Sequence, residues 1–238
     1  MCSIGGYIAK KENAEFAQSK FTNILLAGEV RGTDACGIAF NTGKKRFYYC
    51  KAPCPASKFI KEKYYKDLIL EFKPSIMIGH NRAMTQGDEA NNYNNHPIVT
   101  KTGLSLIHNG IISNDKELAT EYNLTMDGEV DSEIIVRMIE YFIYVKGYPT
   151  IKAIKEMAGK VRGSMAIALL NAKEPHTAYL LASDNPINLA YHTTTGTIFF
   201  ASTGEILKRG LMEYDYYFNG LFRRIQGKDG FIFEELPE

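Results

Sequence analysis

The chain begins Met1-Cys2-Ser3-Ile4-Gly5-Gly6-Tyr7-Ile8. Removal of Met1 would leave Cys2 with a thiol and a free α-amino group on one Cα. The ordinary pKa is about 7.7–8.0 for an α-amino group and about 8.5 for a thiol, so near neutral pH this amine can accept the thiol proton. Residues 3–8 predict a short strand that holds the terminus in place. The stretch predicts a self-activated cysteine nucleophile, unless a cysteine at position 2 is accidental.

Length and composition bound the class of protein. The 238 residues are 45% hydrophobic, which is ample for a packed core, so we expect one globular unit over residues 1–238. Lys plus Arg number 28 against 27 Asp plus Glu. This balance creates no global field toward nucleic acid or an anionic membrane, so neither is an expected partner.

Cysteine usage and the lack of a targeting pattern indicate the compartment. The N-terminus lacks a basic segment followed by an apolar run, and the apolar stretch 134–145 is interrupted by Arg137 and Glu140. Four cysteines without a signal peptide fit a reducing compartment, so we expect a cytoplasmic protein. Cys50 and Cys54 are not accompanied by a second Cys/His pair at ligand spacing. We therefore expect Cys36, Cys50 and Cys54 to be structural, and no metal site or cofactor.

Periodicity separates the chain into helices and strands. Apolar residues at helical spacing predict helices over residues 13–26, 57–72, 131–145, 149–157 and 205–211, with Ser57 as N-cap of the second and Gly28 ending the first. Alternating patterns between turns predict strands over residues 3–8, 35–40, 46–50, 75–79, 104–108, 111–112, 164–170, 176–182, 188–192, 197–201, 214–219, 222–225 and 231–233. Residues 88–95 predict a loop. Strands on both sides of a central pair of helices indicate an α+β fold of four layers, two antiparallel sheets with helices outside.

Five ordered stretches carry a resemblance to a known family: Cys2-Ser-Ile-Gly-Gly, Arg31-Gly-Thr-Asp-Ala-Cys-Gly37, Gly79-His-Asn-Arg-Ala-Met-Thr-Gln-Gly87 with Asn95-His96-Pro97, His108-Asn-Gly-Ile-Ile-Ser-Asn114, and Asp131-Ser-Glu133. In this order and spacing they resemble the class II glutamine amidotransferase domain, the N-terminal-nucleophile (Ntn) glutaminase unit of glucosamine-6-phosphate synthase, amidophosphoribosyltransferase and asparagine synthetase. The resemblance implies the four-layer αββα Ntn-hydrolase sandwich.

The resemblance also implies a reaction. Cys2 would attack the side-chain amide of glutamine, release ammonia and leave a γ-glutamyl thioester for water to hydrolyse. The family stabilises the oxyanion with an Asn side chain and the next Gly backbone N–H, which here match Asn109 and Gly110. Its substrate-binding residues match the four residues Arg82 for the α-carboxylate, Thr85 beside it, His96 in the mobile glutamine loop, and Asp131 for the α-ammonium.

Each matched residue also has a purely structural interpretation. Asn109-Gly110 is a common type I′ turn pair between two apolar strands, and Asp131 before an apolar helix is an N-cap by default. Arg82 could be a surface charge. His96 and His108 are more often structural hydrogen-bonding residues than catalysts, and we assign neither a proton-transfer role. We expect Arg31 and Asp34 to form a structural turn pair near the nucleophile strand.

The sequence departs from the family in two respects. Ala83 and Gln86 stand where the sugar-phosphate synthases have an aromatic residue and a histidine, and no synthase domain follows before Glu238. We therefore expect a glutaminase that supplies ammonia to a synthase on a separate chain. Two alternatives stay open: a stand-alone γ-glutamyl amide hydrolase, and a catalytically degenerate partner protein. Homo-oligomerisation is also open.

Overall fold

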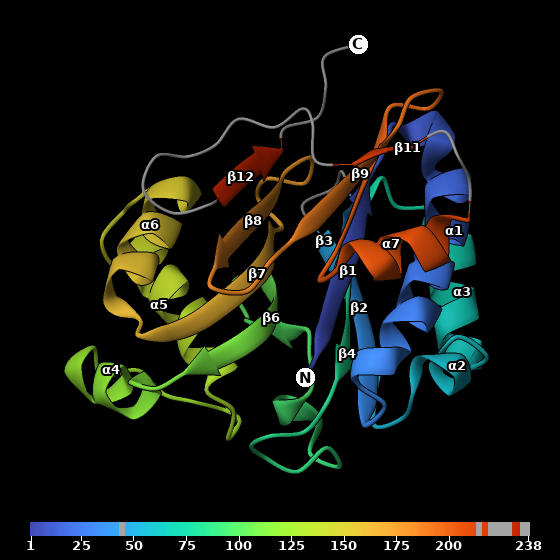
Figure 1. Cartoon of the computed structure of the whole chain (residues 1–238). Helices are drawn as coiled ribbons and strands as arrows, with labels where there is room; N and C mark the ends of the chain where they lie inside the picture. The colour runs from blue at the N-terminus through green and yellow to red at the C-terminus, as the bar shows by residue number, and fades with distance from the viewer. Residues whose placement is uncertain (43–45, 213–215, 219–229, 234–238) are drawn as a thin grey trace.

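Two antiparallel sheets face each other in the middle of the molecule, and helices cover their outer faces (Figure 1). This computed structural model describes residues 1–42, 46–212, 216–218 and 230–233. The seven-stranded sheet has the order β11-β9-β10-β1-β4-β2-β3, and the five-stranded sheet has the order β12-β8-β7-β6-β5. The α+β architecture of two helix-flanked antiparallel sheets is confirmed.

The strands of the seven-stranded sheet are β1 (Ser3–Ile8), β2 (Ala35–Thr42), β3 (Arg46–Ala52), β4 (Ile76–Arg82), β9 (Asn188–His192), β10 (Thr197–Ala201) and β11 (Tyr216–Phe218). Those of the five-stranded sheet are β5 (Ile98–Val99), β6 (Leu104–Ile112), β7 (Gly163–Asn171), β8 (Ala178–Ser183) and β12 (Gly230–Phe233). The helices are α1 (Ala14–Gly28), α2 (Ala56–Phe59), α3 (Lys63–Phe72), α4 (Asp115–Glu121), α5 (Ser132–Tyr144), α6 (Thr150–Lys160) and α7 (Gly204–Leu211).

The N-terminal strand β1 is central in its sheet. It pairs antiparallel with β10 on one side and with β4 on the other, and every residue of it is buried. Gly6 permits this close approach, because a Cβ there would lie 2.4 Å from the Met77 carbonyl oxygen. A strand paired on both sides has little freedom, so Cys2 at its start is held in a defined place.

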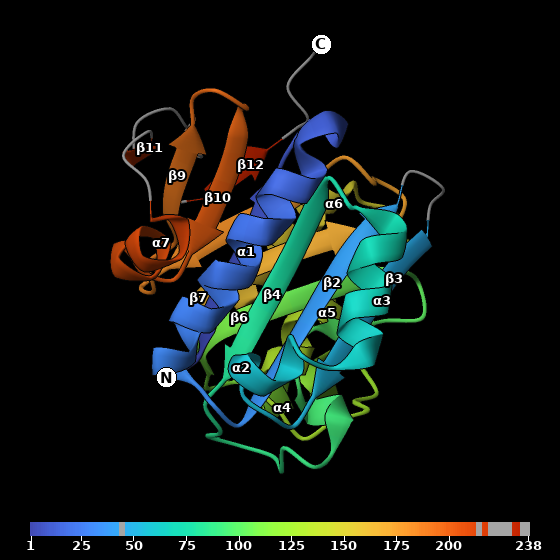
Figure 2. The same cartoon turned by 90° about the vertical axis from the view of Figure 1, so that its right-hand side faces the viewer.

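Three apolar clusters correspond to the layers. One lies between the sheets and includes Ile4, Ile107 and Phe200. A second joins the seven-stranded sheet to α1, α3 and α7, which lie on its outer face (Figure 2). The third joins the five-stranded sheet to α5 and α6. Each large apolar side chain buried in these clusters contributes roughly 1.5–3 kcal/mol, so packing fixes how the two sheets, and the residues between them, lie relative to each other.

The predicted hairpin turn at Asn109-Gly110 is wrong. These residues lie inside β6, which pairs continuously with β7 from Leu104 opposite Asn171 to Ile112 opposite Gly163. Gly110 has a φ of +154°, and a Cβ there would lie 2.0 Å from the Ser164 carbonyl oxygen. The tight approach of β7, which the local sequence does not encode, therefore overrides the turn preference of an Asn-Gly pair.

The helix predicted over residues 57–72 is also wrong as one element. It consists of α2 and α3, separated at Ile60–Glu62. Ser57 is no N-cap, because its backbone nitrogen and hydroxyl both donate to the Glu29 carboxylate, at 2.7 and 3.0 Å. The break allows Phe59 and Tyr65 to be buried together, with ring centroids 5.3 Å apart.

Other boundaries differ less. Gly28 is the last residue of α1 and is followed by a 3₁₀ turn. The loop over 88–95 contains a 3₁₀ turn at Asn92–Asn94, and the sequence analysis missed α4 and β5. The strands predicted over 214–219 and 231–233 correspond to β11 and β12. The strand predicted over 222–225 lies outside the described residues.

Candidate active site

The Cys2 thiol faces the end of strand β4. Its Sγ lies 3.4 Å from both the backbone nitrogen and the carbonyl oxygen of Ala83, the residue after Arg82. Arg31 Nε donates to the Cys2 carbonyl at 2.9 Å. Burial raises the pKa of the Cys2 thiol, while the Ala83 hydrogen bond, the N-terminal charge and Arg82 oppose that rise. Because burial dominates, a base is needed to form the thiolate.

The residues predicted as the site converge from distant parts of the chain. A small cavity of about 20 Å³ is lined by Cys2, Arg82, Ala83, Thr85, Gln86, His96, His108, Gly110, Val130, Asp131 and Ser132. The structure thus brings Cys2, Arg82, Thr85, His96, Gly110 and Asp131 together. Such a volume is that of about one water molecule, so little free space is left between these side chains.

Arg82 is not a surface charge, since only 3% of it is exposed. Its Nη1 donates to Asn95 Oδ1 at 2.8 Å. Its Nη2 donates to the carbonyl oxygens of Gln86 and Gly87, at 2.5 and 2.8 Å. The guanidinium is therefore held by neutral acceptors of the segment that follows it, and no carboxylate hydrogen-bonds to it within the described residues.

Asp131 precedes α5 but does not cap it. Its backbone is helical, and its side chain makes no capping hydrogen bond. Instead Oδ2 accepts from the backbone nitrogen of Ile112 at 2.6 Å, and Oδ1 accepts from Ser132 Oγ at 3.3 Å. These contacts fix the carboxylate at the end of β6, on the wall of the cavity. The N-cap interpretation of Asp131 is wrong.

Asn109 differs from the other predicted residues, because it does not line the cavity. It is 4% exposed, and its Nδ2 donates to Ser202 Oγ at a distance of 3.5 Å. The same Ser202 hydroxyl accepts from the backbone nitrogen of Ile4 at 2.9 Å. Ser202 therefore bridges the Asn109 amide and the strand that carries Cys2, a link that its isolated position in the sequence did not reveal.

Three buried histidines lie beside the cavity. His80 Nε2 donates to the His108 carbonyl at 3.0 Å, and His108 Nδ1 contacts Ser132 Oγ at 2.8 Å. Burial lowers the pKa of His80 to about 3 and that of His108 to about 4, and it lowers the pKa of His96 well below its ordinary value. All three rings are therefore neutral near neutral pH.

His96 is not the structural hydrogen-bonding residue that a buried histidine usually is. Only 5% of it is exposed, yet neither ring nitrogen has a hydrogen-bond partner among the described residues. Its ring packs on His80 with centroids 4.2 Å apart. The ring is thus positioned by packing, and His96 is one of the residues that line the cavity.

Several residues that shape the site were missed or misread from the sequence. Ala83 contacts the thiol and Asn95 holds Arg82, although their residue types carry little signal. Arg31 and Asp34 are not partners of each other. Arg31 binds the Cys2 carbonyl, and Asp34 Oδ2 accepts from the backbone nitrogen of Met84 at 2.6 Å. The Arg-Gly-Thr-Asp motif was the signal that could have revealed both contacts.

Within the described ranges, His, Cys, Asp and Glu side chains form no group of three or more that could hold a metal ion. No helix in the described part of the chain has both the length and the apolar character needed to cross a membrane.

The chain is similar in sequence to known proteins. Residues 80–209 match the sequence model of a family described as "Glutamine amidotransferase domain". Glutamine–fructose-6-phosphate aminotransferase (isomerizing) from Staphylococcus aureus is 32% identical over 197 residues, which cover 79% of this chain and 30% of that protein. 7-Cyano-7-deazaguanine synthase 2 from Sulfurisphaera tokodaii is 30% identical over 209 residues, which cover 86% of this chain and 44% of that protein. The chain thus spans less than half of these relatives.

A solved structure shares the fold. Glutamine phosphoribosylpyrophosphate amidotransferase from B. subtilis superimposes with a TM-score of 0.72 at 14% identity, over 98% of this chain and 49% of that one. The likeness shows the Ntn-hydrolase architecture alone. Because the family match covers more than half of the chain, the chain belongs to the class II glutamine amidotransferase domain family, a family of enzymes.

Proposed function

We propose that this chain hydrolyses the side-chain amide of glutamine through Cys2 and supplies the ammonia to a synthase. One observation carries the proposal. The Cys2 thiol, the Arg82 guanidinium and the Asp131 carboxylate line the same cavity. A nucleophile beside one cation and one anion is complementary to a zwitterionic amino acid whose side-chain carbonyl reaches the thiol.

The proposed reaction begins once Met1 has been removed. The α-amine of Cys2 accepts the thiol proton, and the thiolate attacks the amide carbon of glutamine. The resulting oxyanion is stabilised by the Asn109 side-chain amide and the Gly110 backbone N–H. The ammonium of Cys2 then protonates the amide nitrogen of this intermediate, and collapse breaks the C–N bond and releases ammonia. Water then attacks the thioester and gives glutamate, and the thiol is restored.

The Asn109 contact supports this role. Its hydrogen bond to Ser202 Oγ, at 3.5 Å, is at the long limit of such bonds. Little is lost when the amide exchanges that acceptor for an oxyanion, which binds more strongly because it is charged. Ser202 also fixes β1 through the Ile4 nitrogen, so the nucleophile and the oxyanion donor share one support.

Substrate entry requires a change in the segment after Arg82. The cavity of about 20 Å³ is smaller than a glutamine molecule. The carbonyl oxygens of Gln86 and Gly87 accept the hydrogen bonds of Arg82 Nη2. We place the α-carboxylate of the substrate at this nitrogen. A carboxylate binds a guanidinium more strongly than a neutral carbonyl does, so substrate can displace them. Thr85 and His96 lie on the same segment and would reach the bound amino acid together with Arg82.

The acceptor of the ammonia belongs to the proposal as well. The S. tokodaii relative is named as a synthase, and the S. aureus relative as an aminotransferase that uses glutamine. We place the acceptor chemistry on a separate chain and treat residues 2–238 as one catalytic unit. The cluster between the sheets and the hydrogen bond from Asn41 Nδ2 to the Asn171 carbonyl, at 2.9 Å, support a single unit.

The test is a glutaminase assay with and without a synthase. Protein captured from the native host on this chain is identified, and ammonia release from glutamine is measured with the chain alone and with the captured protein. We expect slow release alone and stimulation by a synthase, with both activities lost in Cys2→Ala. Retained activity in Cys2→Ala would show that Cys2 is not the nucleophile. Maximal glutamine hydrolysis by the chain alone, with no capture, would instead favour the γ-glutamyl amide hydrolase.

A further inference from the structure

A second, larger cavity is lined in part by residues that flank His96 in the sequence. It measures about 540 Å³, within the range of about 300–1,000 Å³ typical of small-molecule sites. Its lining comes from β3 (Tyr49, Cys50, Lys51), from Tyr64 on α3, from the segment before β5 (Asn92, Tyr93), from β5 (Ile98, Val99) and from Asp127 and Glu133. None of these residues lines the Cys2 cavity.

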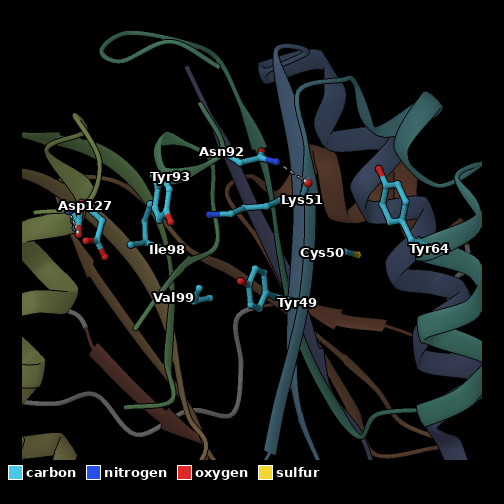
Figure 3. Close-up of a pocket in the computed structure, with 10 residues that line it drawn as sticks. Tyr49, Cys50, Lys51, Tyr64, Asn92, Tyr93, Ile98, Val99 and Asp127 are labelled. Carbon is cyan, nitrogen blue, oxygen red and sulfur yellow. Dashed lines mark hydrogen bonds between the residues drawn. The ribbon is translucent and has the colours of Figure 1, made fainter. Parts of the chain in front are cut away.

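The strands β3 and β5, which both line the cavity, are edge strands of the two sheets. Figure 3 shows the Lys51 side chain extending from β3 toward Tyr93 and Ile98, with Tyr49 and Val99 beside it. Cys50 and Tyr64 lie on the opposite side of β3 in the same view. The face with Lys51 therefore combines one amine with aromatic and aliphatic side chains.

Lys51 holds its amine at the cavity with two hydrogen bonds. Its Nζ donates to the carbonyl oxygens of Asn95 and Pro97, at 2.7 and 2.9 Å. An ammonium has three N–H donors, and in the described part of the chain these two neutral carbonyls are its only hydrogen-bond partners. Burial lowers the pKa of Lys51 to about 8, and the carboxylate of Glu133 opposes part of that shift. At neutral pH the amine is mostly charged, with one donor left.

The two acidic residues of the lining already have partners. Glu133 accepts from the backbone nitrogens of Asp127 and Gly128, at 2.9 and 2.7 Å, and from Arg137 Nε at 2.9 Å. Asp127 pairs with Arg137 Nη2 at 2.5 Å. Arg137 also contacts Glu140, so one guanidinium faces three carboxylates and compensates their charge only in part. Lys51 is the one cationic side chain among the described residues that line the cavity. A single cation beside two carboxylates suits a monoanion and disfavours a polyanion such as a nucleoside triphosphate.

The remaining walls favour a flat apolar body. Tyr93 and Tyr49 are 64% and 45% exposed, which is high for large aromatic side chains that border a cavity. Ile98, beside Tyr93, and Val99, between Ile98 and Tyr49 in this view, add apolar surface (Figure 3). Rings of this kind bind planar molecules by stacking and by burial of apolar area.

We propose that this cavity binds a small molecule with a planar apolar body and one carboxylate, and that the carboxylate accepts the third N–H of Lys51. The ligand lies against the Tyr93 and Tyr49 side chains. It would contact the segment that holds Arg82, because Asn95 accepts from Lys51 through its carbonyl and from Arg82 through its side chain.

The test uses 2-naphthoate as the probe and the uncharged 2-naphthamide as its matched control, with calorimetric titration of the full chain. We expect saturable naphthoate binding, with the amide roughly 10- to 100-fold weaker, because it cannot form a charge-assisted hydrogen bond. The Lys51→Met substitution should weaken naphthoate binding by a similar factor. Lys61 is an exposed lysine outside the cavity, so Lys61→Met should leave naphthoate binding unchanged.

A second variant and a labelling experiment make the test decisive. Tyr93→Ala retains Lys51 and should weaken both probes, so it tests the site even if Lys51→Met fails to fold, which thermal melting reports. Covalent labelling of Cys2 should leave naphthoate binding intact. The absence of saturable binding, equal binding of acid and amide, or loss of binding on Cys2 labelling would each overturn the proposal. Because the readout is binding, the result is independent of glutaminase activity.

Discussion

Asn95 Oδ1 accepts a hydrogen bond from Arg82 Nη1 at 2.8 Å. The Asn95 amide group donates in turn to the Glu89 carbonyl at 2.7 Å and to Asn92 Oδ1 at 2.9 Å. The orientation of the guanidinium thus depends on a residue in the segment that moves on substrate entry in the proposed mechanism. Arg82 and this segment form one unit, and the proposed affinity for glutamine should depend on both.

Asn95→Ala should therefore raise the KM for glutamine by roughly 10- to 100-fold, since it removes one hydrogen bond to a charged group. The kcat should change little, because Asn95 does not contact the reacting atoms. Asn91→Ala is the matched control: Asn91 Oδ1 accepts from the Tyr93 backbone nitrogen at 3.1 Å in the same segment and makes no contact with Arg82. Equal KM values in the two variants would contradict the link.

Asp131→Asn separates charge from structure. The amide oxygen can still accept from the Ile112 backbone nitrogen, the contact that Asp131 Oδ2 makes at 2.6 Å. The melting temperature should therefore stay close to that of the wild type, while the KM for glutamine rises roughly tenfold or more through loss of the anion for the α-ammonium. Steady-state kinetics and thermal melting decide this. An unchanged KM would show that Asp131 does not bind the substrate.

A glutamine-mimicking diazo-ketone amino acid should label Cys2 once and abolish activity, and intact mass should show that Met1 has been removed. The other thiols are internal controls. Burial raises the pKa of Cys50 to about 12, and it raises the pKa of Cys36 well above its usual range, so neither forms a reactive thiolate near neutral pH. Peptide mapping locates the label. Full activity in protein that retains Met1 would exclude the α-amine of Cys2 as base.

Asn109→Ala should lower kcat by about 10²–10³ with a smaller effect on KM, the loss expected for one oxyanion donor. Asn185→Ala is a suitable control, because Asn185 Nδ2 donates at 3.0 Å to the Asn109 carbonyl and not to its side chain. The two variants are compared by single-turnover kinetics. A normal kcat in Asn109→Ala would show that Asn109 is not an oxyanion donor and that its role is limited to the contact with Ser202.

Stability should fall as the solution becomes acidic. Burial lowers the pKa of His80 to about 3, below the ordinary value of about 6.5 in the unfolded chain. The unfolded state therefore binds more protons below pH 6.5, so the stabilisation is fully present above that pH and is lost as the pH falls toward 3. For His80 alone the loss between pH 7 and 5 is about 2 kcal/mol.

Urea unfolding at pH 7, 6 and 5 measures this dependence. His80→Gln should reduce the slope of unfolding free energy against pH, and His176→Gln, at an exposed position, should leave it nearly unchanged. The slope is informative even if His80→Gln is less stable at every pH. Identical slopes in the two variants would show that His80 is not neutral in the folded protein.

The sequence alone determined the chemical composition of the site and most of the elements that carry it. The apolar periods that predict α1, α5 and the strands after Gly163 are local properties, and so is the order of the motifs that contain Cys2, Arg82, Gly110 and Asp131. The single helix predicted over 57–72 failed where burial of Phe59 and Tyr65 favoured a break.

Only the tertiary structure decided how these residues meet. Cys2 contacts Ala83, which is 81 residues away, and Ile4 contacts Ser202 across 198 residues. Asn109-Gly110 lies in a strand and not in a turn because β7 pairs along the whole of β6. Asn95 and Lys51 acquire their contacts in the same way, since long-range pairing is set by burial and register over the whole sheet, for which neighbouring residues contain no local signal.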